Sequence, residues 1–428
     1  MKKIILVSFY FVPCTLTPAQ RLSYWAENFY RLGYYPIVVT RAWDKQIKTH
    51  QDTKISFGEK LRIEKFQTHE VHYLPFSPGI LDSAYRHFGE NFLRPLFLAI
   101  KILDVILASV TLKFTSFSNF QPYLEKLIQD QKPEKIIISG EPFYLFRIGY
   151  NLRKKLGISW IADYRDDWST NELQMQKGGG LIRKWIANLE ANYERLWVSS
   201  AEFIISVSEP YTTRISSFLL KKGVTIQNGF EESLLEIPQQ ELEEEFTVMY
   251  SGVLYPSQNL TCVLDALELA YQEKKPFKLV FLGAGFDVKE KKRIESLVPD
   301  YLSDYVEVTT RFTRNEAIER LQSAHILLGI AYGEMKGIPS SKLYEYLALG
   351  KPVLLCPSDG DVMERILRES KLGFFANTPE EAKSLIGDIR ELYLNEKKLA
   401  AMKENSRRFI LPYSRFNQLN ELAKHLAN

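Results

Sequence analysis

A cluster of charged residues follows one strongly apolar segment of the chain. Asp163, Arg165 and Asp166 come directly after the apolar run at 160–162, and charges in this position are hard to explain as part of a core. Carboxylates packed around one arginine shift each other's pKa values, as often happens in catalytic sites. Glu141 ends an earlier apolar run and is expected to point towards the same site. The alternative is an Arg-carboxylate network that only fixes the loop.

A second group of residues has the types and spacing to bind a nucleotide. Pro339 with Ser340 or Ser341 would begin a helix whose free backbone N–H groups suit a phosphate, and Lys342 would add positive charge. Glu345, one turn further, can accept two hydrogen bonds from the hydroxyl groups of a ribose. The alternative is an ordinary helix cap followed by an exposed Glu-Lys pair.

Both groups need elements that bring them to one place. Apolar runs with strand character alternate with amphipathic segments along the whole chain, which predicts an α/β protein with doubly wound, Rossmann-like parallel sheets. Strands are expected at 3–11, 36–40, 135–139, 159–163, 201–207, 246–251, 277–282, 306–309, 325–330 and 352–356. Helices are expected at 20–32, 124–129, 144–156, 181–198, 260–272, 290–297, 314–323, 341–349 and 416–426.

The length of 428 residues favours two domains of roughly 200 residues each. We expect an N-terminal domain at 1–235, a second domain at 236–410 beginning with an acidic, Gln-rich stretch, and a helix at 411–428 that packs back towards the first domain. Ligands of such sheets bind at the carboxyl ends of the strands. The two groups of residues are therefore expected to face a central cleft.

The segment at about 70–120 interrupts the first domain and mixes basic, aromatic and apolar residues. Such a segment could lie in a membrane interface, with Phe92, Leu96 and Phe97 in contact with lipid. The alternative is a pair of amphipathic helices packed on the sheet. Charged residues interrupt its apolar run, so it is not expected to span a membrane.

Composition excludes several classes of protein. Fifty-five Lys and Arg against 52 Asp and Glu leave a formal charge of +3, too balanced for a strongly basic nucleic-acid binder. Three widely spaced cysteines support neither a disulfide framework nor a zinc site, and no histidine pair suggests a metal. Since the beginning of the chain does not read as a signal peptide, we expect a cytoplasmic protein. From the histidines and cysteines we expect neither a metal nor a cofactor.

The spacing of Glu345, Gly350, Pro352 and Val353 resembles the signature of glycosyltransferase family 4, a group with the GT-B fold, here of the bacterial surface-polysaccharide type. The resemblance implies a nucleotide-diphosphate sugar as donor, and a glycan or polyprenyl-linked acceptor at the inner membrane face. It also implies retention of the anomeric configuration without a metal ion. Ser340, Ser341, Lys342 and Glu345 would then bind the donor.

Two further donor segments resemble the family, with departures. Gly252 and Gly283 lie in strand-turn patterns like those of its donor site. The places of an Arg-Lys pair that binds the diphosphate in many relatives hold uncharged residues, Gln258 among them. Gly337 stands where a second glutamate contacts the donor sugar, so either Glu334 replaces that glutamate or the contact is lost.

The first domain resembles the family in its acceptor half. The pattern Asp-x-Arg-Asp-x-Trp, ending at Trp168, is similar to that of relatives acting on surface polysaccharides, and the segment 9–21 resembles the acceptor loop. Arg21 and Trp168 are therefore assigned to acceptor binding. The catalytic candidates, which would orient the acceptor, are Asp163, Arg165, Asp166 and Glu141. Asn228-Gly229 resembles the Asn-Gly pair that closes the first domain in this family, near the hinge between the domains.

The departures leave two other functions open. A catalytically degenerate GT-B protein could bind a sugar or a partner without transfer, and a nucleotide-sugar epimerase would need no acceptor. Binding of a nucleotide would argue against the first, and dependence on an acceptor would argue against the second.

Overall fold

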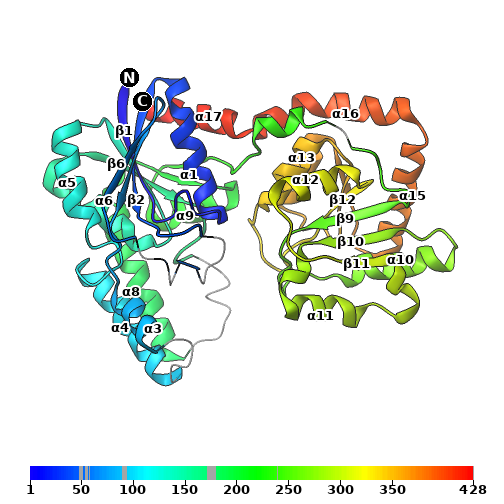
Figure 1. The fold of residues 1–428 in the computed structure, drawn as a ribbon, viewed down its shortest axis with the longest axis horizontal. Coiled ribbons are helices and arrows are strands. Elements are labelled where there is room, and N and C mark those ends of the chain that lie inside the picture. The colour runs from blue at the N-terminus through cyan, green and yellow to red at the C-terminus, as the bar shows by residue number, and fades with distance from the viewer. Residues whose placement is uncertain are drawn as a thin grey trace. The chain divides into compact units, whose positions relative to one another are not determined.

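The computed structural model describes residues 1–47, 52–53, 56, 58–88, 94–170, 180–238 and 240–427. The chain divides into two compact units (Figure 1). Unit 1 comprises Met1–Ile226 and Leu419–Asn428, and unit 2 comprises Gln227–Gln418. Each unit is built on its own, largely parallel sheet.

Unit 1 contains an eight-stranded sheet in the order β3-β4-β2-β1-β5-β6-β7-β8. All neighbouring strands run parallel except β3 and β4, which are antiparallel. The strands are β1 (Lys2–Val7), β2 (Tyr34–Arg41), β3 (Arg62–Lys65), β4 (Glu70–Leu74), β5 (Lys135–Ser139), β6 (Ser159–Tyr164), β7 (Ile204–Ser206) and β8 (Gly223–Thr225).

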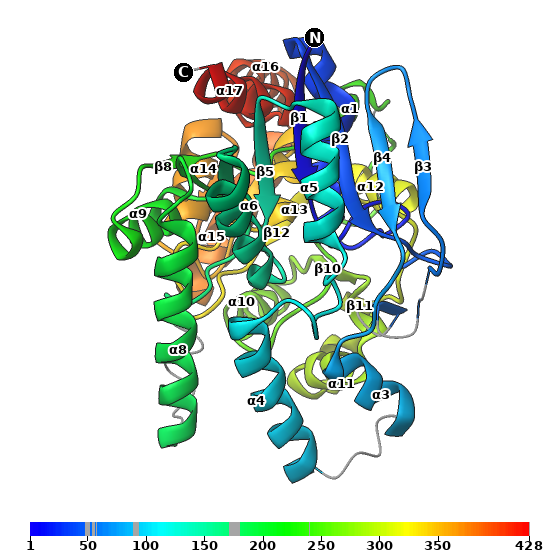
Figure 2. The same ribbon diagram turned by 90° about the vertical axis from the view of Figure 1, so that its left-hand side faces the viewer.

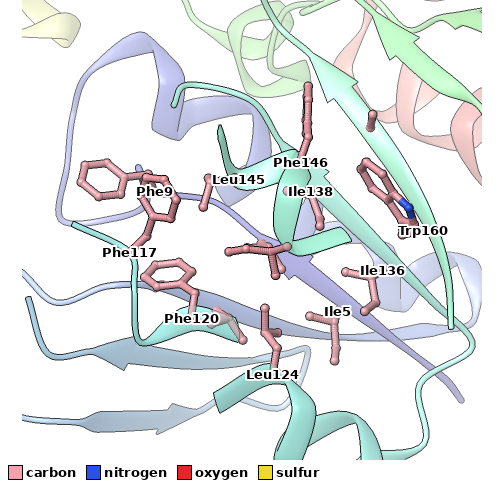
Figure 3. Close-up of a cluster of buried hydrophobic side chains, with 14 of the residues drawn as sticks. Ile5, Phe9, Phe117, Phe120, Leu124, Ile136, Ile138, Leu145, Phe146 and Trp160 are labelled. Atoms are coloured by element: carbon pink, nitrogen blue, oxygen red, sulfur yellow. The ribbon is translucent and has the colours of Figure 1, made fainter. Parts of the chain in front are cut away.

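Helices cover both faces of this sheet. They are α1 (Thr17–Asn28), α3 (Ile80–Phe88), α4 (Arg94–Val110), α5 (Phe120–Gln131), α6 (Phe146–Leu156), α8 (Leu181–Val198), α9 (Glu209–Leu219) and, from the end of the chain, α17 (Arg415–Ala427). Side chains alternate across a strand, so Ile5 lies in the core with α5 and α6 (Figure 3) and Leu6 in the core with α1 and α17. Both faces of the central strands are therefore buried.

Unit 2 contains a six-stranded, all-parallel sheet in the order β11-β10-β9-β12-β13-β14. The strands are β9 (Thr247–Ser251), β10 (Lys278–Leu282), β11 (Val306–Val308), β12 (Ile326–Gly329), β13 (Val353–Leu355) and β14 (Gly373–Phe375). The helices are α10 (Thr261–Gln272), α11 (Val288–Leu297), α12 (Arg314–Ser323), α13 (Ser341–Leu349), α14 (Val362–Ser370), α15 (Pro379–Tyr393) and α16 (Glu396–Ile410).

The division between the units lies earlier than the expected boundary at 235/236. Phe230 and Leu234 are buried in the core of unit 2, so the segment 227–235 packs with the second sheet. The return to unit 1 begins at Leu419, after the expected residue 411, because Tyr413 also packs in the core of unit 2. Burial of apolar residues, and not the acidic stretch, sets these bounds.

The segment at 70–120 begins as part of the sheet. Glu70–Leu74 forms the buried strand β4, in which the Glu70 carboxylate lies 3.3 Å from Nε2 of His72. The polar residues of this strand hide its β character in the sequence. The helices α3 and α4 follow, and Phe92 lies outside the described residues. In the part of the chain that the structure describes, no helix is long and apolar enough to cross a membrane.

Candidate functional site

Two glycine turns lie together at the carboxyl edge of the unit 2 sheet. Gly252 follows β9 with φ +89° and Gly283 follows β10 with φ +83°, a region that glycine adopts readily. A Cβ atom on Gly283 would lie 3.8 Å from Cα of Gly252. These predicted donor residues therefore belong to adjoining loops.

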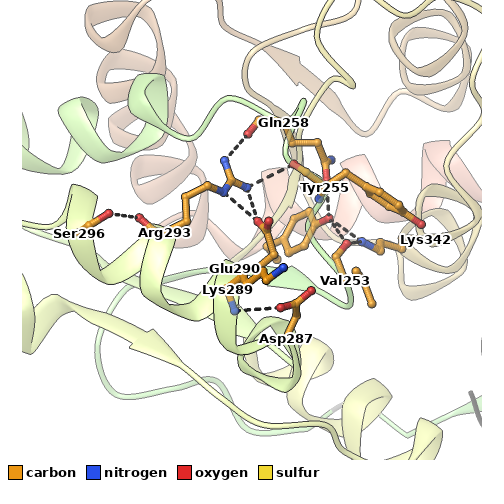
Figure 4. Close-up of polar contacts among 10 residues, drawn as sticks. Val253, Tyr255, Gln258, Asp287, Lys289, Glu290, Arg293, Ser296 and Lys342 are labelled. Carbon is orange, nitrogen blue, oxygen red and sulfur yellow. Dashed lines mark hydrogen bonds and ion pairs between the residues drawn. The ribbon is translucent and has the colours of Figure 1, made fainter. Parts of the chain in front are cut away.

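The side chain of Lys342 lies over the Gly252 turn. A Cβ atom on Gly252 would come within 2.9 Å of Cε of Lys342, so a larger residue at 252 would displace the end of the Lys342 side chain. Nζ of Lys342 donates to the hydroxyl of Tyr250 at 2.5 Å and to the carbonyl of Val253 at 2.8 Å (Figure 4). Burial lowers the pKa of Lys342 to about 7, against the opposing effect of Glu345.

The first turn of α13 is open to a ligand at its amide end. Ser340 is the N-cap residue, but its side chain makes no capping hydrogen bond, and Ser341 is exposed. The Ser340 hydroxyl instead accepts a long hydrogen bond of 3.5 Å from the hydroxyl of Tyr332. Uncapped N–H groups at the beginning of a helix attract anions, and Lys342 is in this same turn.

Glu345 lies one turn into α13 and forms an ion pair. Its Oε1 atom is 3.3 Å from Nη2 of Arg314, and Nη1 of Arg314 also lies 2.9 Å from Oε2 of Glu231. Arg314 is thus shared by two carboxylates. The arrangement holds the Glu345 side chain beside α12.

Gln258, in place of a cation, has a structural task. It is 2% exposed, and its Nε2 atom donates to the carbonyl of Ile330 at 2.8 Å. The carbonyls of Gln258 and Tyr255 accept hydrogen bonds from Arg293 of α11, at 3.0 and 3.2 Å (Figure 4). A cation therefore does brace this loop, but it comes from a later helix and points to backbone oxygens and to Glu290, 2.7 Å away.

A carboxylate lies beside Gly337, and it is not Glu334. Glu334 is exposed in the loop between β12 and α13. The N–H of Gly337 donates to Oδ2 of Asp361 at 2.5 Å. Asp361 belongs to the next loop along the sheet, after β13, so spacing around residue 337 could not reveal it.

In unit 1, Asp163 and Arg21 meet each other in the core. Their side chains are 0% and 4% exposed, with Nη2 of Arg21 3.4 Å from Oδ1 of Asp163. The hydroxyl of Ser139 donates to the other carboxylate oxygen at 2.9 Å. This catalytic candidate and this acceptor candidate thus form a buried ion pair that joins β6 to α1.

The other three catalytic candidates come together at the carboxyl edge of the same sheet. Nη2 of Arg165 lies 2.5 Å from Oε2 of Glu141 and 3.3 Å from Oδ2 of Asp166. The two carboxylates are about half exposed, whereas Arg165 is 9% exposed. Glu141 has φ +66°, a strained conformation for a non-glycine residue that is common at functional sites.

Tyr10 completes this group and escaped sequence reasoning. Burial, and then the nearby carboxylate of Glu141, raise the pKa of Tyr10 to about 12, while Arg165 opposes the rise. The ring of Tyr10 stacks on Trp43 at 6.4 Å. Its place in the apolar run at 3–11 concealed it, because the strand β1 ends earlier than expected, at Val7.

Trp168 packs inside an aromatic cluster. It is 5% exposed, and its ring stacks on Phe143 with centroids 5.1 Å apart and planes at 7°. The ring of Trp168 also stacks on that of Trp197, with the two centroids 6.2 Å apart. These contacts support a packing role for Trp168 and leave little of the indole for an acceptor.

Apart from the buried Arg21, Asp163 and Trp168, the candidate residues thus form two groups, one at the carboxyl edge of each sheet. Among the described residues, no group of three or more His, Cys, Asp and Glu side chains is placed to hold a metal ion.

Comparison with known proteins identifies the fold. Residues 235–409 match the model of the family Glycosyl transferases group 1. No curated protein matches the chain significantly in sequence. The sucrose-phosphate synthase of Thermosynechococcus elongatus is similar in structure, with a TM-score of 0.63 and 15% identity over 100% of this chain and 98% of that one.

Two ligand complexes are also similar. Anabaena HepE, in complex with UDP-glucose, has a TM-score of 0.59 and 12% identity, with both chains covered completely. The catalytic domain of starch synthase IV from Arabidopsis thaliana, bound to ADP and acarbose, has a TM-score of 0.60 and 11% identity over 100% of this chain and 99% of that one. The expectation of a GT-B fold with two parallel-sheet domains is confirmed.

Proposed function

We propose that the protein is a glycosyltransferase of the family 4 type, which transfers a hexosyl group from a nucleotide-diphosphate sugar to a hydroxyl of a glycan or a lipid-linked acceptor. The observation that carries the proposal is the open amide end of α13 with Lys342 beside it, within the segment that matches glycosyl transferases group 1. Similar structures contain UDP-glucose and ADP, which supports a nucleotide donor.

Unit 2 would bind the donor. The N–H groups at Ser341 and Lys342 would receive the diphosphate, and the cationic form of Lys342 would stabilise the charge that develops as the diphosphate leaves. Glu345 would accept hydrogen bonds from the ribose, using the carboxylate oxygen that does not face Arg314. No metal or cofactor is part of this proposal, since the nucleotide sugar is a substrate.

Unit 1 would bind the acceptor. The carboxylates of Glu141 and Asp166 are about half exposed and both pair with Arg165, and such a group can orient sugar hydroxyls by charge-assisted hydrogen bonds. We propose retention of configuration. The acceptor oxygen bonds to the anomeric carbon as the bond from that carbon to the diphosphate oxygen breaks, and the leaving phosphate takes the acceptor proton.

The cellular setting is proposed on the same grounds. A polyprenyl-linked acceptor in surface-polysaccharide synthesis would place the enzyme in the cytoplasm, in peripheral contact with the inner membrane. Gly337 and the uncharged Gln258 loop keep a catalytically degenerate binding protein as the second candidate, because they remove two groups that would otherwise hold the donor.

Calorimetric titration with UDP, GDP, ADP and CMP would test the donor site. We expect one nucleotide to bind, and we expect Glu345→Ala and Lys342→Ala each to weaken it roughly tenfold or more, the size expected for losing a charged hydrogen bond. Glu391→Ala, in α15, serves as the matched control on an exposed carboxylate.

Failure of all four nucleotides to bind at millimolar concentration would favour the degenerate protein. Binding that survives both substitutions in α13 would show that the nucleotide site lies elsewhere.

A further inference from the structure

One end of unit 1 exposes apolar side chains on the first turns of α8. Leu181 is 87% exposed, Ile182 60% and Trp185 52%. At 100° per residue, these three positions fall within an arc of about 100° on the helix. An exposed apolar group of this kind, on one face of a helix, indicates an interaction surface.

Trp185 is exceptional among the tryptophans of this protein. The chain contains six, and the other five, Trp25, Trp43, Trp160, Trp168 and Trp197, are at most 6% exposed. The protein therefore buries its indoles everywhere except at this helix end. Tryptophan is a preferred residue at the boundary between lipid and water, where its apolar ring and polar N–H are both accommodated.

Basic residues border the apolar arc. Arg183 and Lys184 are exposed, and the first two turns of α8, residues 181–188, contain no acidic residue. A helix with a basic polar side and Trp, Leu and Ile on the other side has the composition of one that lies in an anionic membrane interface. The positive charge of Arg183 and Lys184 favours an anionic lipid surface over an uncharged protein groove as the partner of this helix end.

The topology places this helix end on the acceptor side of unit 1. The chain leaves the carboxyl end of β6 at Tyr164 and returns through α8 to β7. Eighteen helical residues span about 27 Å, more than the roughly 20 Å of the six-residue strand β6. Because only the last turns of α8 are buried, at Glu194, Trp197 and Val198, its beginning extends beyond the carboxyl edge of the sheet.

Two other helices reach the same end of unit 1. Figure 2 shows α4 there between α8 and α3, and α4 contacts both of these helices. Phe88, the last residue of α3, is 56% exposed, and Leu103 of α4 is 46% exposed. Exposed apolar side chains therefore also occur on the two neighbouring helices.

We propose that the beginning of α8, with Leu181, Ile182 and Trp185 as the inserted residues, docks unit 1 onto an anionic lipid bilayer. The inference rests on the proposed function, to which it adds the surface that would bring Glu141 and Arg165 to an acceptor carried by lipid. It differs from the sequence-based expectation, which assigned lipid contact to Phe92, Leu96 and Phe97.

Flotation with vesicles tests the docking surface. We expect the full chain to float with phosphatidylcholine vesicles that contain phosphatidylglycerol, and much less with phosphatidylcholine alone. The triple variant Leu181→Ser, Ile182→Ser and Trp185→Ser should lose roughly tenfold or more of its partition. The matched control exchanges Leu220, Val288 and Leu394, which are 90%, 64% and 77% exposed elsewhere, for Ser and should bind as the unmodified chain does.

The charges have their own test. Arg183→Gln and Lys184→Gln should each weaken binding to the anionic vesicles about fivefold at low salt. The control pair is Lys397→Gln and Lys398→Gln in α16, two exposed lysines next to each other.

Brominated lipid would locate the inserted residue. Because the other five tryptophans are buried, bromine in the upper acyl chain should quench Trp185 fluorescence, and Trp185→Phe should bind vesicles with little quenching. Absence of flotation, or equal losses in the control triple variant, would overturn the proposal. A lipid-free dimer of the unmodified chain that the triple serine variant abolishes would assign the surface to a second copy instead.

The outcome is separable from that of the donor site. The triple serine variant should keep the nucleotide affinity of the unmodified chain. Flotation without nucleotide binding would reject the proposed transferase and keep the membrane surface, whereas nucleotide binding without flotation would do the reverse.

Discussion

Lys342 and Asp163 show how burial changes what a charged side chain can do. Lys342 is held by two neutral oxygen atoms, from Tyr250 and Val253, so its positive charge is not cancelled by a carboxylate within bonding distance. Asp163, by contrast, is matched in the core by Arg21. The first arrangement leaves a cation to respond to a ligand, and the second uses its charges to stabilise the fold.

The lowered pKa of Lys342 predicts a pH dependence of nucleotide binding. Burial lowers it to about 7, and a bound diphosphate would raise it by favouring the charged amine. Between these two values binding takes up a proton, so affinity should fall as the pH rises, by up to tenfold per unit. Calorimetry from about pH 7.5 to 9.5, above the phosphate pKa of about 6, measures this slope.

Lys342→Arg provides the control, because arginine stays charged over this range. Its affinity should be nearly independent of pH. An equal slope in this variant and in the unmodified chain would attribute the pH dependence to another group.

At the scale of elements, buried polar pairs join helices to the carboxyl end of strand β6. The Arg21–Asp163 pair connects α1 with β6. Tyr164 and Glu194 do the same between β6 and α8, with the hydroxyl donating at 2.9 Å, and burial raises the pKa of Glu194 to about 7. Since Asp163 and Tyr164 directly precede Arg165 and Asp166 in the chain, the two pairs also fix the loop that carries the acceptor candidates.

Asp163→Ala should therefore act through stability. Removing one partner leaves the buried Arg21 charge uncompensated, which typically costs about 3–5 kcal/mol. We expect this loss in the free energy of unfolding, measured by urea titration. Asp166→Asn is the matched control, because Asp166 is 58% exposed and such surface pairs contribute about 1 kcal/mol or less.

Sugar transfer by Asp166→Asn should nevertheless decrease if Asp166 orients the acceptor. Unchanged stability of Asp163→Ala would contradict the structural reading of the buried pair.

At the scale of the whole molecule, two distant segments of the chain run side by side where unit 2 begins. Phe230 and Ser414 form a parallel bridge, and Glu231 pairs with both Arg314 and Arg415. Although burial opposes it, these two arginines lower the pKa of Glu231. The stabilisation from this carboxylate is therefore present above its unfolded pKa and is lost as the pH falls below it.

Gly229 allows these two segments to approach each other closely. Its φ is +65°, and a Cβ atom there would lie 2.8 Å from the carbonyl oxygen of Tyr413 and 3.0 Å from the amide nitrogen of Arg415. Gly229→Ala should destabilise unit 2 by about 1–3 kcal/mol, because backbone strain and a contact with main-chain atoms add. Gly157→Ala, at φ +70° with no atom within 4 Å of the new Cβ, is the control for strain alone. Equal losses in the two variants, measured by calorimetric unfolding, would exclude the contact with Tyr413.

The sequence by itself determined much of the fold, because its signals are local. Helix α13 lies at 341–349 as expected, between Ser340 and the left-handed Gly350, and α8 and α12 also have the predicted bounds. The apolar runs of β5 and β6 were recognisable for the same reason. Strand β4 was missed, because Glu70 and His72, which pair with each other on one face of this strand, are buried although their residue types look exposed in the sequence.

Only the tertiary structure decided which candidate residues are neighbours. It paired Arg21 with Asp163, set Asp361 beside Gly337, added Tyr10 to the Glu141–Arg165 group and left Trp185 at the surface. Each of these facts joins segments from different strand ends or depends on how much of a side chain its neighbours cover. Spacing along the chain specifies secondary structure through local geometry, but contact and burial are set by the way distant segments pack.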